Sequence, residues 1–171
     1  GVERFMKHYF LITKTVGDLT RVLCAVLEED HKKRRSRLRL PKLTFMRRTA
    51  SGFKIDGDRL TVSSPRVFAE DPARLLRLFH EAQRLDLDIH PHALRLVHQN
   101  LRLIDGAVRA SAEANRLFME MLTFPGGPEI TLRRLNEAGV FGRFIPEFGR
   151  IVAQMQYDMY HIHTVDEHTI H

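Results

Sequence analysis

The sequence predicts a mainly α-helical fold, a multi-helix bundle with one small β-hairpin near residues 53–62. Apolar residues recur at three- and four-residue spacing through most of the chain, which is the spacing of amphipathic helices. Ser, Asp, Pro and Gly stand at the points where these helices would begin or end. The chain has 171 residues, of which 43% are hydrophobic and 28% charged, so it can bury a core without disulfides.

The first predicted helix covers roughly the first thirty residues. Gly17 is a candidate point at which this helix loosens or divides in two. Cys24, the single cysteine, lies among apolar neighbours, and we therefore expect a buried core thiol in a reducing, cytoplasmic setting. The apolar positions are Val2, Phe5, Tyr9, Ile12, Val16, Leu19, Leu23, Val26 and Leu27.

The remaining elements are predicted from local signals. Asp56-Gly57 suits a tight turn between two short alternating segments, 53–55 and 60–62, which indicates a hairpin. Gly139 is expected to end a helix. Proline at the first helical turn, or an Asp or Ser cap, predicts further helices that open at Asp71-Pro72, Pro91, Ser111, Pro128 and Pro146.

The positive charge is concentrated in one segment. Residues 31–48, "HKKRRSRLRLPKLTFMRR", hold nine of the 27 Lys and Arg and no Asp or Glu, although the net charge of the chain is only +6. This segment is either a patch for RNA or another polyanion or a solvated connector after a helix. It contains one aromatic residue, Phe45, whereas nucleic-acid binding commonly adds several aromatic side chains for base stacking.

Two candidate sites in the middle of the chain have simpler structural explanations. Asp86 and Asp88 form a D-x-D, a pair that can hold magnesium. No Gly-Ser turn precedes the pair and Asp88 comes just before a helix start, so we expect a structural role. His90 and His92 flank Pro91 and are expected to be exposed residues of a first helical turn.

The last twelve residues, "YHIHTVDEHTIH", combine four histidines with two carboxylates. Thr164 and Glu167 form a T-x-x-E capping box, which gives the acidic residues a structural explanation. His168 and His171 lie three residues apart and could share a metal, but a complete site needs more ligands than this segment supplies. From the residues alone, a polar helix start and part of a metal site both stay open.

The chain resembles the bacterial bifunctional PII uridylyltransferase/uridylyl-removing enzymes over almost its whole length. The stretches that carry the resemblance are "RFMKHYFLITKTVGDLTRVLCAVLEE", "DPARLLRLFHEAQRLDLDIHPHALRLV" and "NEAGVFGRFIPEFGRIVAQMQYDMYHIHTVDEHT". The resemblance implies that residues 1–155 are the helical domain that follows the nucleotidyltransferase core, and that 156–171 begin an HD-type phosphohydrolase domain. His168 then corresponds to the first metal-ligand histidine of that domain.

The resemblance also implies the chemistry of a parent enzyme. Its transferase would attach UMP from UTP to the PII nitrogen-signalling protein, its HD domain would remove the UMP, and glutamine would regulate both. It would use Mg²⁺ or Mn²⁺ and work in the cytoplasm, without membrane or nucleic acid. This chain lacks the complete catalytic sets, so we expect it to be inactive alone, with no tightly bound cofactor. Contacts to UTP or PII are expected from Lys32, Lys33, Arg34 and Arg35.

From the residues alone, functions of other classes stay open for this chain. The main alternative is a free-standing basic helical module that binds RNA or another polyanion through residues 31–48. A structural dimerisation segment is another. The missing ligands argue against a stand-alone metal phosphohydrolase.

Overall fold

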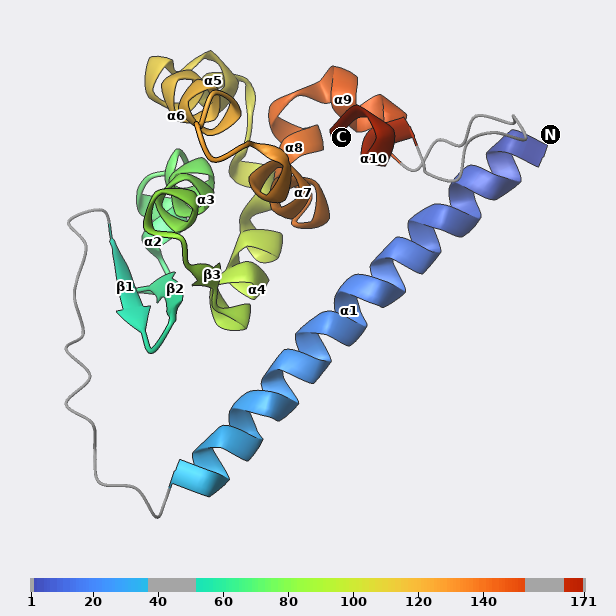
Figure 1. The fold of residues 1–171 in the computed structure, drawn as a ribbon. Helices are drawn as coiled ribbons and strands as arrows, with labels where there is room; N and C mark the ends of the chain where they lie inside the picture. Colours follow the sequence, from blue (N-terminus) through green and yellow to red (C-terminus); the bar gives the residue numbers. More distant parts are fainter. Residues whose placement is uncertain (1, 37–51, 153–164, 171) are drawn as a thin grey trace.

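A computed structural model describes residues 2–36, 52–152 and 165–170 and confirms the mainly α-helical fold (Figure 1). The chain begins with the long helix α1 and continues through a β-hairpin into a group of shorter helices. The elements are α1 (Val2–Ser36), β1 (Phe53–Asp56), β2 (Arg59–Val62), α2 (Val67–Glu70), α3 (Arg74–Leu85), β3 (Asp88–Ile89), α4 (Pro91–Asn100), the 3₁₀ turn η1 (Leu101–Leu103), α5 (Gly106–Ala110), α6 (Ala112–Leu122), α7 (Glu129–Glu137), α8 (Val140–Phe144), α9 (Pro146–Ile151) and α10 (Val165–Ile170).

The predicted hairpin is present and is extended by a third, short strand. β1 and β2 pair antiparallel, with Phe53 opposite Val62, and β3 joins β2 in parallel, with Leu60 opposite Ile89. The parallel pairing continues beyond β3, because the backbone N–H of His90 donates to the carbonyl of Leu60 at 2.8 Å. Phe53 and Leu60 are fully buried, so the sheet joins the hydrophobic core of the helices.

Helix α3 lies at the centre of the core. Its apolar residues follow the helical period and turn to one side, where the following are buried: Leu75, Leu76, Leu78, Phe79 and Ala82. α3 contacts α2, α6, α7 and β3. Burial of a large apolar side chain stabilises a fold by about 1.5–3 kcal/mol, so this one helix face supplies a substantial part of the driving force for packing.

The polar side of α3 is linked to α6. His80 Nε2 lies 2.9 Å from a carboxylate oxygen of Glu120, and the Gln83 amide donates to the carbonyl of Met121 at 3.2 Å. The hydrogen bond from Arg116 is the main cause that lowers the pKa of Glu120 below its ordinary value of 4.5, and His80 lowers it further. The two helices are therefore held by apolar contacts and by polar groups at their edge.

Helix starts and stops largely follow the local signals. Pro91 and Pro146 are the first residues of α4 and α9, and the Ser111 hydroxyl caps α6 by accepting from Ala114 N–H at 3.4 Å. Gly139 follows the end of α7 with φ of 75°. The Asp71 carboxylate accepts from the N–H of Ala73 at 3.1 Å in a turn, so regular helix begins slightly later, at Arg74.

Two expectations about the first helix are wrong. α1 is continuous across Gly17, because one helical glycine costs only about 1 kcal/mol relative to alanine. Cys24 is exposed instead of buried. The reason is that α1 turns its apolar stripe away from the other helices, and Cys24 lies at the edge of that stripe. Figure 1 shows α1 as a long rod beside the bundle, and within the described structure its most extensive contact with another element is with α4.

Helices α8 and α9 approach each other through two glycines. A Cβ placed on Gly149 would lie 2.6 Å from the carbonyl oxygen of Gly142, and one on Gly142 would lie 2.9 Å from the Cα of Gly149. Next to this contact the rings of Phe141 and Phe148 stack with centroids 3.8 Å apart. The absence of side chains at the glycines therefore permits the backbone separation that the aromatic stack requires.

We predict that Gly149→Ala lowers the free energy of unfolding by about 1–3 kcal/mol, the usual cost of overpacking. The added methyl group would meet backbone, which cannot rotate away as a side chain can. Urea unfolding monitored by circular dichroism measures the change.

The matched control is Gly106→Ala, because the nearest atom to its new Cβ is Arg109 Nη2 at 3.9 Å. This variant should be as stable as the unmodified chain or more stable by about 0.4–1 kcal/mol. Equal midpoints for the two alanine variants would contradict the close approach of α8 and α9.

Candidate functional site

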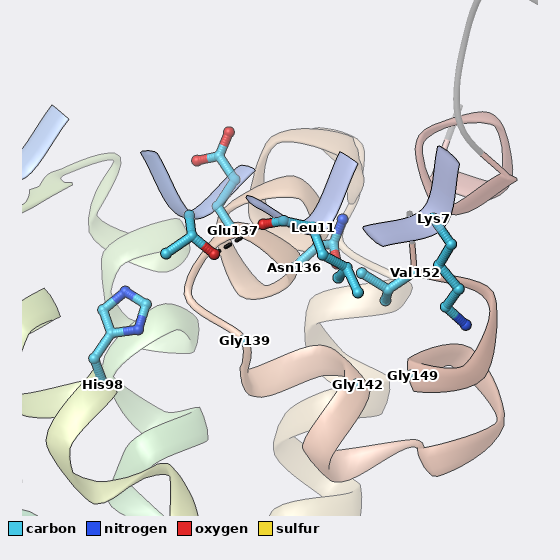
Figure 2. Close-up of a pocket in the computed structure, with 10 residues that line it drawn as sticks. Lys7, Leu11, His98, Asn136, Glu137, Gly139, Gly142, Gly149 and Val152 are labelled. Carbon is cyan, nitrogen blue, oxygen red and sulfur yellow. Dashed lines mark hydrogen bonds between the residues drawn. The ribbon is translucent and has the colours of Figure 1, made fainter. Parts of the chain in front are cut away.

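A cavity of 330 Å³ lies where α1 passes over the helices of the bundle (Figure 2). α1 forms one wall and α4, α7, α8 and α9 form the others. The lining residues are Lys7, Leu11, Thr15, His98, Asn136, Glu137, Gly139, Gly142, Gly149 and Val152. Sequence reasoning missed this cavity, because its walls come from segments far apart in the chain.

The cavity stays open because glycines line one side of it. Gly142 and Gly149 present backbone to the space, and Gly139 adds a turn without a side chain between α7 and α8. Their spacing in "GVFGRFIPEFG" was the one signal in the sequence, since it repeats glycine through two adjacent short helices. The same close backbone contact that joins α8 to α9 thus shapes the cavity.

The polar groups of the cavity are suited to binding more than to chemistry. Lys7 Nζ donates to the carbonyl of Arg150 at 3.1 Å and ties the start of α1 to α9. The Thr15 hydroxyl donates to the Leu11 carbonyl at 2.8 Å within its own helix, so it is not set against a base as an activated nucleophile would be. Glu137 and the exposed His98 add a carboxylate and an imidazole at the rim.

The D-x-D pair has the expected structural role. Asp86 ends α3 in the left-handed conformation, with φ of 52°, and its N–H binds carbonyls of the last turn. Asp88 forms an ion pair with Arg134 of α7, whose guanidinium also donates to the Leu87 carbonyl at 3.3 Å. The two carboxylates are therefore used to end a helix and to fix β3 against α7.

His90 and His92 are half-buried, so the expectation that both are exposed is wrong. His90 is the N-cap of α4, and its Nδ1 accepts from the backbone N–H of His92 at 3.1 Å. The position between β3 and α4 buries this turn against the sheet. Within the described part of the chain, no three His, Cys, Asp or Glu side chains gather in a way that could hold a metal ion.

The predicted functional residues lie at the edges of the described structure. His168 belongs to α10, which contacts α7 and α9 and buries Ile170. Only the backbone of His168 is described, and Thr164 lies outside the described residues. Lys32 to Arg35 form the last turns of α1, again described by their backbone alone, and positions 37–48 of the basic segment fall outside. All these assignments remain predictions.

Comparison with known proteins identifies the family to which this chain is similar. Residues 53–144 match the family described as "Uridylyltransferase GlnD third domain". Over 99% of its length the chain is 58% identical to a "Bifunctional uridylyltransferase/uridylyl-removing enzyme" of Azospirillum brasilense. It is 55% identical, over the same share, to the protein of that name from Rhodospirillum rubrum.

The chain spans about 18% of the length of each of these two relatives. No solved structure matches the chain. Among the described residues, no helix is both long enough and apolar enough to span a membrane.

The role of Asp86 can be tested by a pair of substitutions. We expect Asp86→Ala to lower the free energy of unfolding by about 1 kcal/mol, because alanine is strained in the left-handed region. Asp86→Gly should match or slightly exceed the stability of the unmodified chain. Thermal unfolding distinguishes the two, and equal losses for both would instead assign the stabilisation to the carboxylate.

Proposed function

The chain belongs to the third-domain family of the uridylyltransferase GlnD, and we propose that it is the central helical part of a bifunctional uridylyltransferase/uridylyl-removing enzyme. The observation that carries the proposal is the match of 99% of this chain to 18% of each relative, at 58% and 55% identity. In such an enzyme this chain would join two catalytic parts.

The proposed parent reaction has two directions. A transferase part would attach UMP from UTP to a tyrosine of the PII signalling protein, and an HD-type part would hydrolyse that bond, with glutamine setting the balance. Residues 1–155 would follow the transferase core and residues 156–171 would begin the HD part; the border between them lies outside the described residues. The contact of α10 with α7 and α9 supports a firm attachment of the second part.

The role of this chain is positional. The described residues contain no group of three possible metal ligands, so they do not fit a complete Mg²⁺ or Mn²⁺ site. His168 would contribute one ligand to a site completed elsewhere in the parent protein, where the metal would supply Lewis-acid chemistry. The residues of this chain would hold the two catalytic parts at a fixed distance, and we propose that the chain alone catalyses neither reaction.

We predict that His168→Ala in the full-length enzyme lowers the rate of UMP removal by more than about 100-fold, since loss of even an outer-shell partner of a metal site costs 10–100-fold. The rate of UMP transfer by this variant should stay within about twofold of the rate of the unmodified enzyme, because the transferase would use a separate site. Release of UMP from uridylylated PII and incorporation of labelled UMP measure the two rates.

The control for that variant is His8→Ala, which removes an exposed imidazole from α1 and should change neither rate. Equal loss of both reactions in His168→Ala would contradict a ligand role. Transfer or removal of UMP by the purified 171-residue chain would contradict its inactivity.

The basic end of α1 gives a second test. Replacement of Lys32, Lys33, Arg34 and Arg35 by Gln should raise KM for PII or UTP at least about threefold, because exposed ion pairs each contribute about 0.2–1 kcal/mol. Replacement of the exposed Arg95 and Arg102 by Gln, which removes positive charge elsewhere on the surface, is the control and should leave both Michaelis constants unchanged. Unchanged Michaelis constants would refute the contact, and salt-dependent binding of RNA by the 171-residue chain would favour the polyanion-binding alternative.

A further inference from the structure

Helix α1 carries a continuous apolar stripe that the described structure leaves uncovered. Leu19 is 68% exposed and Phe5 67% exposed, although such residues are normally buried when they recur along a helix. We call this stripe the α1 seam, and it consists of Phe5, Tyr9, Ile12, Val16, Leu19, Leu23 and Leu27.

The seam and the bundle lie on different sides of α1. Lys7, Leu11 and Thr15 follow one another at four-residue spacing and face the cavity and the bundle. At about 100° per residue, the seam is centred roughly 125° around the helix from these three residues. The contact with the bundle therefore leaves the seam uncovered.

A long helix whose apolar face is uncovered lacks the packing that normally stabilises it. α1 extends over 35 residues, and helical stability in proteins comes chiefly from packing of an amphipathic face and less from intrinsic propensity. Large exposed apolar patches on soluble proteins mark sites of interaction. The seam therefore requires a partner.

The spacing of the seam indicates what kind of partner fits. From Phe5 to Leu23 its residues alternate between four- and three-residue steps, the 3.5-residue period with which two helices pack knobs into holes, and one more four-residue step reaches Leu27. The distance from Phe5 to Leu27 along the axis is about 33 Å at 1.5 Å per residue. A helix of similar length with its own apolar stripe would cover the seam.

The residues beside the seam indicate a permanent contact. Thr13, Gly17, Thr20 and Cys24 follow one edge of the seam and are exposed. Pairs of separate helices commonly select each other through charged residues at such flanking positions. Here that edge carries no charge, and permanent interfaces are the more hydrophobic class.

We propose that the α1 seam is the docking face for an apolar helix of the same polypeptide, outside these 171 residues. The inference rests on the proposed function, because the relatives contain several times more polypeptide than the matched region. α1 is then a shared element: its Lys7 side binds the bundle and its Leu19 side binds the neighbouring part of the enzyme.

Cysteine accessibility tests the proposal directly. Leu19→Cys places a thiol on the seam. Arg95→Cys places a control thiol at an exposed position of α4. Each is labelled with a maleimide, in the 171-residue chain and in the full-length enzyme, and quantified peptide by peptide by mass spectrometry. Circular dichroism checks folding, and Val16→Cys replaces Leu19→Cys if that variant is unstable.

We expect the seam thiol to react at least about tenfold more slowly in the monomeric full-length enzyme than in the 171-residue chain, because labelling then requires local opening. The control thiol should react at similar rates in both. Equal rates for the seam thiol would overturn the proposal. Protection that appears only as light scattering detects dimers would assign the seam to a second copy and overturn it as well.

The experiment distinguishes failure of this proposal from failure of the proposed enzymatic function. UMP transfer and removal are measured on the same full-length preparation before labelling. A full-length protein that is inactive but protects the seam would refute the function and keep the docking face, and an active protein that leaves the seam reactive would do the reverse.

Discussion

The burial of one face of α3 is the constraint on which the rest of the bundle depends. Leu75, Leu76 and Phe79 are almost fully removed from solvent, and this requires α6 and α7 on one side and the sheet on another. The charged residues of α3 are then placed at the border of the core. Arg77 reaches Glu113 of α6 and Arg74 reaches Glu70 and Asp71, so burial and charge pairing select the same arrangement.

The chain contains two kinds of helix, which differ in how they bury their apolar faces. The short helices between residues 67 and 151 cover one another and complete a core. None of the described side chains of α1 belongs to that core, and α1 contacts the bundle through a side that includes a lysine and a threonine. The cavity beside α1 follows from this difference, because polar side chains opposite glycine backbone cannot fill the space as an apolar face would.

Features set by neighbouring residues could be predicted from the sequence. The Asp56-Gly57 turn, the prolines that open α4 and α9, and the inward face of α3 all depend on local geometry and period. Features set by distant residues could not. The exposure of Cys24, the half-buried His90 and the pairing of His80 with Glu120 each depend on which face another element covers. A two-residue strand such as β3 is too short to leave a periodic pattern.

The parallel pairing of β2 with β3 has a consequence for where the chain can be divided. A hairpin alone is marginal in water, and here its inner edge binds a strand that follows α3, with Leu60 accepting from the N–H of His90. The hairpin and the helices therefore form one cooperative unit even though they differ in secondary structure. A cut placed after Val62 would leave β3 with an open edge and the core without Phe53 and Leu60. A minimal stable version of the bundle accordingly begins before Phe53.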